Sequence, residues 1–383
     1  MDNISFSKEE LARYNRHIII PDFGIEAQKK LKKARVLVVG SGGLGSPLLL
    51  YLAAAGVGTI GIIDFDIVED SNMHRQVLFG VDEIGLNSLL PKVEAAKKRI
   101  EGINPYITIN AYNKKLTSEN ALELISQYDV IADGTDNFPT RYLVNDACVL
   151  SNKTNVYASI FQFEGQVSVF NHFDEGVRGP NYRDLYETPP PAGLVPSCAE
   201  GGVLGVLPGI IGSLQALEVI KVITGVGDVL SGKLYTFDAL SFQAHTFKLK
   251  RKESNPLNGA NPSITALIDY DQFCNIGNEQ RNIKEIDADE LNALIEGEEL
   301  FQLIDVREQH EFDLEDIGGE LIPLGAVLDK ADKIKRDRKV VIHCKMGGRS
   351  AKAIRDLEDR FAFDNLYNLK GGINSYLKQY KPR

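Results

Sequence analysis

The sequence has few cysteines, no excess of basic residues and no signal-peptide pattern. Its four cysteines lie far apart and show no disulfide framework, which favours a reducing compartment and a cytoplasmic protein. The net charge of −10 argues against nucleic acid as a general partner. The first residues, MDNISFSKEE, contain neither a basic stretch nor an apolar core, so we expect no signal peptide.

The sequence also lacks an uninterrupted apolar run of membrane-spanning length. Its long apolar stretch, residues 201–226, is broken by Pro208, Gln215, Glu218 and Lys221. We therefore expect a helix of the core or of a subunit interface there, rather than a membrane span. Internal repeats are absent too, and a chain of 383 residues suffices for two or three domains.

The segment from residue 36 to residue 76 is the most informative part of the chain. Val36–Val39 has the pattern of a buried parallel strand and runs directly into G-S-G-G-L-G. A helix is expected at Pro47–Ala55, followed by a second strand at Thr59–Ile63. Glycines let backbone amides approach a phosphate, and an acidic residue at the next strand end can bind a ribose. The pattern therefore predicts a nucleotide site, formed by Gly40, Gly42, Gly43, Gly45 and Asp64.

The residues that follow Asp64 favour chemistry at phosphorus. The sequence D-F-D-I-V-E-D-S-N-M-H-R-Q places Asn72, Arg75 and Gln76 beside the glycine loop. A cation such as Arg75 suits a reaction in which negative charge develops on phosphate oxygens. A polar surface loop is the plain alternative. A nicotinamide-dependent oxidoreductase is a further alternative, but it leaves Arg75 unexplained, and no His–Lys pairing for hydride transfer is identifiable.

Strand-like and helix-like segments alternate from residue 36 to about residue 140, which predicts a doubly wound α/β sheet. A short strand at Val130–Ala132 is followed by D-G-T-D-N. Ligands of such sheets bind at the carboxyl ends of the strands. We therefore expect Asp64, Arg75 and Asp136 to converge on one crevice.

The chain becomes polar and rich in Asn, Pro and Gly after residue 251, which marks a boundary between domains. A second α/β unit follows, with strands expected at Phe301–Asp305 and Val340–Cys344. The expected division is a first domain over 1–274, a linker over 275–282 and a second domain over 283–383.

In the second unit the sequence H-C-K-M-G-G-R-S delivers Cys344 from a strand into a tight loop before a helix. Loop amides and the helix dipole would stabilise an anionic sulfur there, and Lys345 and Arg349 would strengthen that field. A buried, inert cysteine is the plain alternative. Phosphatase loops are a chemical rival, but they usually place one more residue between the cysteine and the arginine. The shorter loop fits a sulfane sulfur better.

Both units resemble known families. The glycine loop and the strand-end motif look like the adenylation domain of the ubiquitin-activating-enzyme superfamily, and D-V-R-E, L-K-G-G-I and the Cys344 loop look like a rhodanese domain. Over its whole length the chain resembles the fused adenylyltransferase–sulfurtransferases of small ubiquitin-like sulfur carriers, which serve molybdopterin, thiamine and thiolated-tRNA synthesis. The resemblance implies Mg-ATP, a carrier ending in Gly-Gly, a carrier adenylate, release of pyrophosphate and a thiocarboxylate product. A persulfide or thiosulfate would donate the sulfur.

The resemblance also assigns roles to individual residues. The phosphate loop falls on the four glycines, the ribose carboxylate on Asp64, and magnesium on Asp136. The resemblance assigns phosphate contacts to Asn72, Arg75, Gln76 and Lys92. It makes Cys344 the residue that carries the persulfide and Cys198 the residue that forms a covalent link to the carrier. It also matches Arg16 to an arginine that a partner subunit lends to the site. Arg16 implies a homodimer. From the residues alone, the alternatives are a Cys198 packed at the start of the apolar helix that follows and an Arg16 that is simply exposed.

A modifier-activating enzyme, with the second unit as a docking module, is the alternative within the same superfamily. Only the sulfurtransferase needs Cys344 as a sulfur carrier.

The chain departs from its relatives at a zinc site that they usually build from two C-x-x-C pairs. The matching positions hold Asn181, Asp184, Asn255 and Asn258. Three carboxamides and one carboxylate are poor zinc ligands. We therefore expect a domain without zinc, whose two segments are joined by hydrogen bonds among these side chains or by packing.

Overall fold

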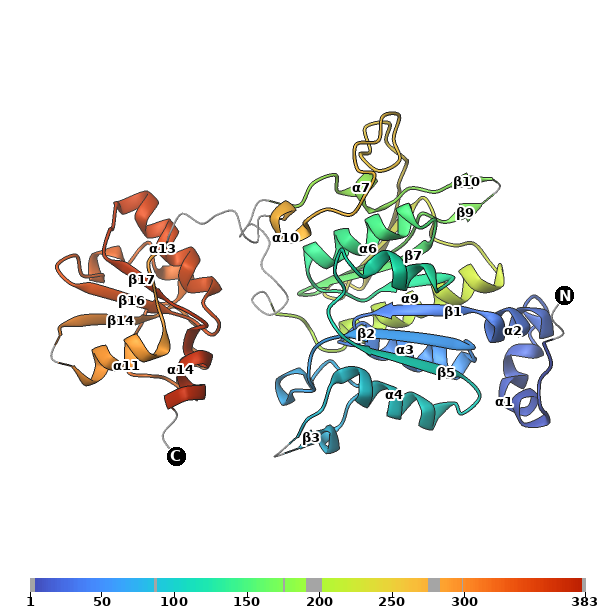
Figure 1. Cartoon of the computed structure of the whole chain (residues 1–383), viewed down its shortest axis with the longest axis horizontal. Coiled ribbons are helices and arrows are strands. Elements are labelled where there is room, and N and C mark those ends of the chain that lie inside the picture. The colour runs from blue at the N-terminus through green and yellow to red at the C-terminus, as the bar shows by residue number, and fades with distance from the viewer. Residues whose placement is uncertain are drawn as a thin grey trace. The chain divides into compact units, whose positions relative to one another are not determined.

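The computed structural model describes residues 4–85, 88–174, 176–190, 202–274, 283–297 and 299–380. The chain divides into two compact units, residues 1–276 and 277–383 (Figure 1). The expected linker, residues 275–282, and Cys198 lie outside the described residues.

The first unit is built on an eight-stranded sheet, which confirms the expected doubly wound α/β fold. Five neighbouring strands pair in parallel, and three antiparallel strands extend one edge. In spatial order the strands are β5 (Thr108–Asn113), β2 (Thr59–Asp64), β1 (Arg35–Val39), β6 (Val130–Asp133), β7 (Thr154–Phe161), β8 (Glu164–Phe170), β11 (Lys233–Asp238) and β12 (Gln243–Lys248).

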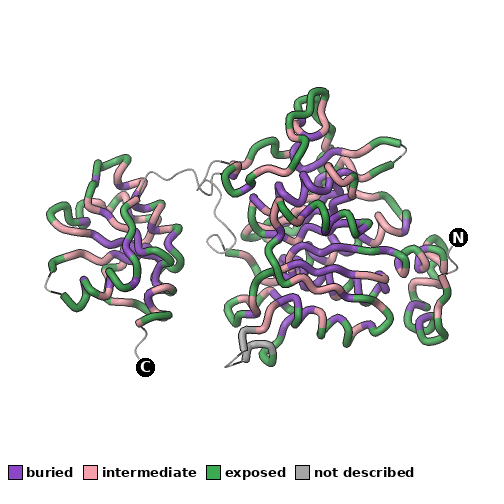
Figure 2. The backbone as a smooth tube through the Cα atoms, in the orientation of Figure 1, coloured by how far each residue is buried: buried purple, intermediate pink, exposed green. Residues whose placement is uncertain are grey.

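Helices cover both faces of this sheet, so its central strands are buried on both sides (Figure 2). In β1 successive side chains point to opposite faces of the sheet, so Val36 and Val38 join one core cluster and Leu37 and Val39 join the other. This explains why the strand is apolar without interruption. The helices that connect or flank these strands are α3 (Gly45–Ala55), α4 (Lys92–Ile103), α5 (Ala121–Ser126), α6 (Phe138–Leu150) and α9 (Leu207–Thr224).

Helix α9 is long and apolar enough to cross a membrane by length and composition alone, and half of its residues are buried inside the unit. It packs against α3 and strands β6, β7 and β8. Its buried Gln215 donates hydrogen bonds to two carbonyl oxygens of the sheet, Asp133 O and Val156 O, both at 2.8 Å. This polar anchoring is typical of a core helix.

Two helices, α1 (Lys8–Ile18) and α2 (Gly24–Lys33), precede the sheet. Ser7 and Glu10 form a capping box at the start of α1. The ring of Tyr14 lies against Gly56, the C-cap of α3, where an added Cβ would come within 2.6 Å of Tyr14 Cζ. Because α3 starts at the glycine loop, α1 lies beyond the other end of that helix.

The second unit has a five-stranded parallel sheet. In spatial order its strands are β13 (Glu285–Ile286), β17 (Leu366–Leu369), β16 (Lys339–His343), β14 (Phe301–Asp305) and β15 (Glu320–Leu321). Val340 and Ile342 of β16 face one core cluster and Val341 faces the other. Its helices are α11 (Ala288–Glu296), α12 (Gln309–Leu314), α13 (Gly348–Phe361) and α14 (Gly372–Tyr380).

Short elements complete the described structure. They are β3 (Ile84–Gly85), β4 (Ser88–Leu89), β9 (Phe173–Asp174), β10 (Val177–Arg178), α7 (Tyr182–Leu185), α10 (Tyr270–Phe273) and the 3₁₀ turns at Asp70–Asn72, Val81–Glu83, Leu324–Ala326 and Ala331–Lys333.

Candidate active sites

The glycine loop lies between β1 and α3, and its shape depends on glycine at both ends. Gly40 has φ of +90°, in the region that favours glycine. A Cβ on Gly45 would lie 2.2 Å from Gly40 O, so the first turn of α3 packs directly on the loop backbone. Ser41 donates two hydrogen bonds to Asp64 Oδ2, from its backbone N and its Oγ, both at 2.8 Å. The loop and the end of β2 therefore form one rigid unit.

One pocket at the carboxyl ends of the strands gathers most of the residues expected from the sequence. These are Gly40, Gly42, Gly43, Asp64, Arg75, Gln76, Lys92 and Asp136. Gly45 and Asn72 are not among its lining residues. Gly45 packs against Gly40 instead, and Asn72 acts on a neighbour, because its Oδ1 accepts a hydrogen bond from Arg75 Nη2 at 2.8 Å. Asn72 thus orients the arginine that faces the pocket.

Lys92 is held at the pocket by Asp66. Its Nζ lies 2.8 Å from Asp66 Oδ2, and its side chain is 5% exposed against 51% for the aspartate. The backbone N of Lys92 also donates to Asp66 O at 2.9 Å. A buried ammonium needs such a partner. The sequence N-S-L-L-P before Lys92 resembles an insertion relative to the family, and Lys92 nevertheless lines the pocket.

The loop after β6 is fixed from several sides, which leaves Asp136 as its exposed carboxylate. Thr135 donates to Asp133 Oδ1 from its N at 3.0 Å and from its Oγ at 2.6 Å. Arg141 Nη2 donates to Thr135 O at 3.0 Å. Asp133 is fully buried, and burial raises the pKa of its carboxyl group. Asp136, the next residue after Thr135, presents to the pocket the hard oxygen ligands that magnesium prefers.

The pocket also contains residues that sequence reasoning missed. Lys114 and Lys115 follow β5, whose Asn113 pairs with Asp64 of β2. The sequence contained a pattern that could have identified them, because they follow a strand that ends at the same sheet edge as the phosphate loop. Ile160 and Val203 also line the pocket, from segments that come later in the chain, and no local sequence pattern marks them as pocket residues.

Arg16 does not reach this pocket in its own chain. It is exposed on α1, next to Tyr14, which contacts the C-terminal end of α3. The glycine loop lies at the other end of α3, and a helix of eleven residues spans about 16 Å. Any contact of Arg16 with a nucleotide would therefore have to be made in another copy of the chain.

In the second unit Cys344 directly follows β16 and is 2% exposed. Gly347 N donates to its Sγ at 3.1 Å, and Ser350 Oγ lies 3.5 Å from the same sulfur. Gly347 has φ of +100°, so the loop requires glycine there. A backbone amide at a helix start can stabilise a sulfur anion, whereas the Ser350 hydroxyl has a closer acceptor in Asn368 Oδ1, at 2.6 Å.

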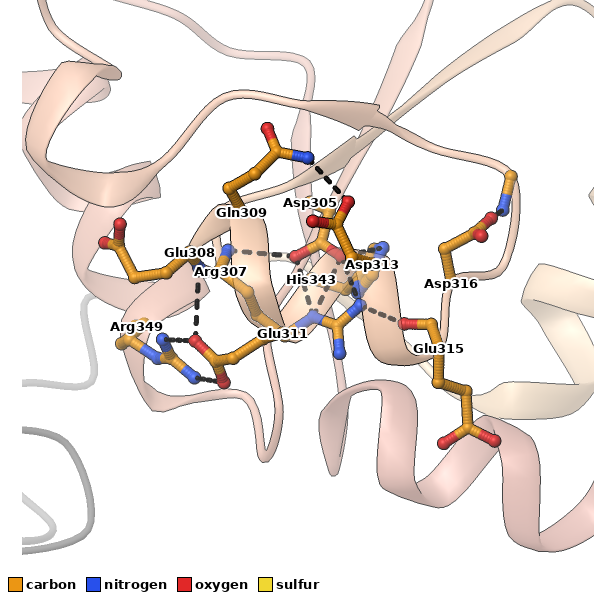
Figure 3. Close-up of polar contacts among 11 residues, drawn as sticks. Asp305, Arg307, Glu308, Gln309, Glu311, Asp313, Glu315, Asp316, His343 and Arg349 are labelled. Atoms are coloured by element: carbon orange, nitrogen blue, oxygen red, sulfur yellow. Dashed lines mark hydrogen bonds and ion pairs between the residues drawn. The ribbon is translucent and has the colours of Figure 1, made fainter.

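Arg349 forms an ion pair with Glu311, as Figure 3 shows. Its Nη1 and Nη2 donate to the two carboxylate oxygens of Glu311 at 2.6 and 2.7 Å. The Arg349 hydrogen bonds lower the pKa of Glu311 to about 2, so the pair stays charged at neutral pH. The guanidinium thus shares its charge with a carboxylate instead of adding it undivided to the field at Cys344.

Asp305, Arg307 and His343 form a buried cluster at the ends of β14 and β16 (Figure 3). Arg307 donates to both carboxylate oxygens of Asp305, with the shortest contact, from Nη2 to Oδ2, at 2.6 Å. His343 Nε2 is 3.9 Å from Asp305 Oδ2. Burial lowers the pKa of His343 to about 4, so its imidazole is neutral at pH 7.

Three of the four residues at the zinc positions, Asn181, Asp184 and Asn258, are connected by hydrogen bonds, while Asn255 forms a local turn contact. Asn181 Nδ2 donates to Asn258 Oδ1 at 3.1 Å, which joins the two segments. Asp184 accepts from Asn181 N and from Lys252 N, both at 2.8 Å, and Asn255 accepts from Leu257 N at 2.9 Å. Within the described part of the chain, no group of His, Cys, Asp or Glu is arranged to hold a metal ion.

Comparisons with known proteins match both units. The model of the ThiF family matches residues 14–258, and that of the rhodanese-like domain matches residues 287–379. The chain is 46% identical to the probable adenylyltransferase/sulfurtransferase MoeZ of Mycobacterium tuberculosis, over 99% of this chain and 95% of that protein. It is 50% identical to the sulfur carrier protein adenylyltransferase of Thermus thermophilus, over 71% of this chain and 99% of that one.

More distant relatives share this architecture or its first part. The adenylyltransferase and sulfurtransferase MOCS3 of Xenopus laevis is 39% identical over 97% of this chain and 87% of its own length. Among solved structures, PaaA is 26% identical with a TM-score of 0.52, covering 66% of this chain and 78% of PaaA. E. coli MccB, solved with ATP, is 23% identical with a TM-score of 0.54, covering 64% of this chain and 73% of MccB, and shares the fold.

Proposed function

The chain belongs to the ThiF family, with a rhodanese-like domain following the ThiF domain, and on this premise we propose how its residues divide the work of an adenylyltransferase and a sulfurtransferase. Its relatives act on sulfur-carrier proteins, so the partner is a ubiquitin-like sulfur carrier. We propose that this carrier ends in Gly-Gly. The observation that carries the proposal is the pairing of a glycine-loop nucleotide pocket with a cysteine held by a loop amide in one chain.

The first step joins the carrier to AMP. The carrier's C-terminal carboxylate attacks the α-phosphorus of ATP, a new oxygen–phosphorus bond forms, and pyrophosphate leaves. We assign the ribose to Asp64, the phosphates to the glycine loop, Gln76 and Lys92, and the developing negative charge to Arg75. Asn72 holds Arg75 in position. An immobile donor at the point where charge develops is the main source of acceleration in such reactions.

Asp136 is the residue that would hold magnesium. It is exposed to the pocket and follows a loop fixed by Asp133 and Arg141, which suits a ligand that must keep its place. A magnesium ion bound there would neutralise phosphate charge.

The second step replaces adenylate by sulfur. We propose that Cys344 carries a persulfide, whose terminal sulfur attacks the carrier's activated carbonyl carbon and displaces AMP. A thiol reductant then cleaves the sulfur–sulfur bond, which gives the thiocarboxylate and a mixed disulfide at Cys344, and a second equivalent of that thiol returns Cys344 to its free form. For Cys198 we propose a covalent link to the activated carrier. The product would serve molybdopterin, thiamine or thiolated-tRNA synthesis. The free, buried cysteines Cys148, Cys274 and Cys344 support a reducing, cytoplasmic location.

A homodimer would complete the nucleotide site with Arg16 of the other copy. Exposed Leu11, Ile19 and Ile20 on and after α1 support an interface there. Mixed dimers of Arg16→Ala and Arg75→Ala chains test it. Each variant alone should lose activity, while mixed dimers should recover part of it, since one of their two sites is intact. Failure to recover activity in dimers shown to be mixed would contradict the shared site.

The first domain should need no zinc, because Asn181 and Asn258 already join its two segments. Chelators should leave its melting temperature unchanged in the absence of nucleotide. Elemental analysis should find no tightly bound zinc, and one zinc per chain in the purified protein would refute this assignment.

Mass measurement of the carrier tests the whole proposal. Candidate carriers from the same cell are incubated with the full chain, ATP, magnesium and a sulfur donor. The carrier's C-terminus should gain the mass of an oxygen-to-sulfur exchange. Cys344→Ala should keep carrier-dependent ATP–pyrophosphate exchange and abolish the mass gain. Loss of both activities in a folded variant would show that the two steps are not divided as proposed.

A further inference from the structure

A row of hydrogen-bonded side chains connects the Cys344 sulfur to the edge strand β13. Ser350 Oγ lies 3.5 Å from the sulfur and donates to Asn368 Oδ1 at 2.6 Å, the shortest contact of this hydroxyl. Asn368 Nδ2 donates in turn to Glu285 Oε1 at 3.1 Å. Cys344, Ser350 and Asn368 are 2%, 0% and 5% exposed, whereas Glu285 is exposed on β13. The row therefore begins at the surface and ends at the buried sulfur.

Glu285 decides which way the Asn368 amide faces. A carboxylate oxygen only accepts hydrogen bonds, so the amide atom that faces Glu285 must be the amino group. The oxygen of the same amide then faces Ser350 and accepts its hydroxyl hydrogen. A hydroxyl has one hydrogen to donate, so Ser350 does not donate to Cys344 Sγ while this contact is made.

We propose that Asn368 is a positioning residue of the sulfur site, which holds the Ser350 hydroxyl hydrogen away from Cys344 and thereby limits how strongly the thiolate is stabilised. The inference rests on the proposed sulfurtransferase function and adds Asn368 and Glu285 to the residues that serve it. Asn368 acts through Ser350 and not by contact with the sulfur donor.

A sulfur that takes up a sulfane sulfur and passes it on has to be nucleophilic as well as ionised. The rate of sulfur exchange rises with the thiolate fraction, but the nucleophilicity of a thiolate falls as the thiolate becomes more stable. The Gly347 amide, whose N lies 3.1 Å from Cys344 Sγ, already supplies one hydrogen bond. A second donor from Ser350 would stabilise the thiolate further and weaken it as a nucleophile. Holding the hydroxyl on Asn368 avoids that loss.

Backbone hydrogen bonds hold the Cys344 loop independently of the Asn368 side chain. Ile373 N, at the start of α14, donates to Cys344 O at 2.8 Å, and Asn374 N donates to Lys345 O at 3.2 Å. The carbonyls of the loop are thus bound by α14, which leaves the loop amides free to face the sulfur. A change of the Asn368 side chain should therefore redirect the Ser350 hydroxyl without releasing the loop.

The test is a set of full-length variants that remove the acceptor and the donor of this hydrogen bond separately and together. Asn368→Leu removes the acceptor at similar volume and frees Ser350 to donate to the thiolate. Gly347 O, 3.0 Å from Ser350 Oγ, is a competing acceptor, but a neutral carbonyl binds a hydroxyl less strongly than an anion does. Ser350→Ala removes the donor, and Asn368→Leu/Ser350→Ala removes both. Asn374→Leu is the matched control, because it makes the same substitution at an exposed residue beside the loop.

The readout is the rate at which iodoacetamide alkylates Cys344 in the reduced protein, measured on the Cys344 peptide by mass spectrometry. Only the thiolate reacts, so the rate at about pH 7 depends on the thiolate fraction and on its nucleophilicity, and the rate at about pH 10 mainly on its nucleophilicity. We expect Asn368→Leu to react about threefold faster than the wild type at the lower pH and about threefold more slowly at the higher pH. A charge-assisted bond in place of a neutral one raises the thiolate fraction about tenfold, and the lower nucleophilicity offsets part of that gain.

The other variants show whether this change passes through Ser350. Ser350→Ala and Asn374→Leu should stay within about twofold of the wild type at both pH values, since a thiol–hydroxyl contact is weak. Asn368→Leu/Ser350→Ala should lose the change seen in Asn368→Leu. Rates in Asn368→Leu that are unchanged, or that move in the same direction at both pH values, overturn the inference, because they would show that the loop has at most loosened. A change that persists without Ser350 overturns it as well.

A second variant covers the case in which Asn368→Leu does not fold. Glu285→Ala, at an exposed position, frees the Asn368 amide to turn, and it should give the same opposite changes in rate, again only when Ser350 is present. The alkylation rates measure the thiol itself. A wild-type chain that transfers no sulfur to any carrier would instead refute the proposed sulfurtransferase function, whatever the alkylation rates are.

Discussion

Replacing Asp146 by asparagine should destabilise the first unit by about 3–5 kcal/mol, the cost of leaving a buried cation without its partner. The carboxylate accepts hydrogen bonds from Arg183 Nε at 2.8 Å and Nη2 at 2.6 Å, and from the Tyr270 hydroxyl at 2.9 Å. The side chains of Asp146 and Arg183 are 0% and 1% exposed. Asn would remove the charge and turn an amide toward donors, so the guanidinium would stay buried and uncompensated.

Calorimetry of the full chain measures this effect. For a unit of this size a loss of 3–5 kcal/mol lowers the melting temperature by about 10 °C. Asp228→Asn, at an exposed position, is the control and should change the melting temperature little. Adding Arg183→Met to Asp146→Asn should recover part of the loss, because it removes the unpaired charge. A melting temperature within about 2 °C of the wild type in Asp146→Asn would show that the ion pair does not hold this region together.

Two further outcomes are expected. Arg75→Ala should lower carrier-dependent ATP–pyrophosphate exchange about a hundredfold, as for loss of one preorganised charge. Asn72→Ala should lower the exchange rate less, because it only releases Arg75 from its hydrogen bond. Full exchange in Arg75→Ala would refute the role assigned to Arg75. The pKa of His343 is about 4 in the folded chain against an ordinary 6.5. Between these pH values the unfolded chain binds a proton at His343 that the folded chain does not bind, so stability is lost as the pH falls. Urea melts should therefore show the second unit losing up to about 3 kcal/mol between pH 6.5 and pH 4. His343→Leu should flatten that loss, and an unchanged pH slope would contradict it.

The parts of the fold that follow from short segments could be predicted from the sequence. Val36–Val39 has no polar position because both faces of β1 are covered, and the glycine loop is specified by its own backbone needs at Gly40 and Gly45. The expected strands are found as β14 (Phe301–Asp305) and, one residue earlier than expected, β16 (Lys339–His343), because apolar residues at their centres mark buried parallel strands.

The parts of the sites that depend on packing between distant segments could not be predicted. Glu311 and Arg349 are 38 positions apart, and nothing in either local sequence says that two charged side chains will meet. Lys114 and Lys115 enter the pocket only because β5 pairs with β2. Arg16 shows another limit, because the resemblance assigns it to the nucleotide site of a partner subunit, and the fold of a single chain does not test that contact.

The two sites of the chain treat negative charge in opposite ways, and the difference follows from what each must hold. The nucleotide pocket is lined by five cationic and three acidic side chains, so it favours a polyanion and the pyrophosphate that develops from it. A loop with a similar excess of positive charge around Cys344 would bind ATP, pyrophosphate and AMP as competitors of the sulfur donor. Because Arg349 is paired with Glu311, the loop around Cys344 offers such anions less net positive charge, while the Gly347 amide still donates to the sulfur. One chain can then keep both reactions in the same solution of anions without either site taking up the other's reactants.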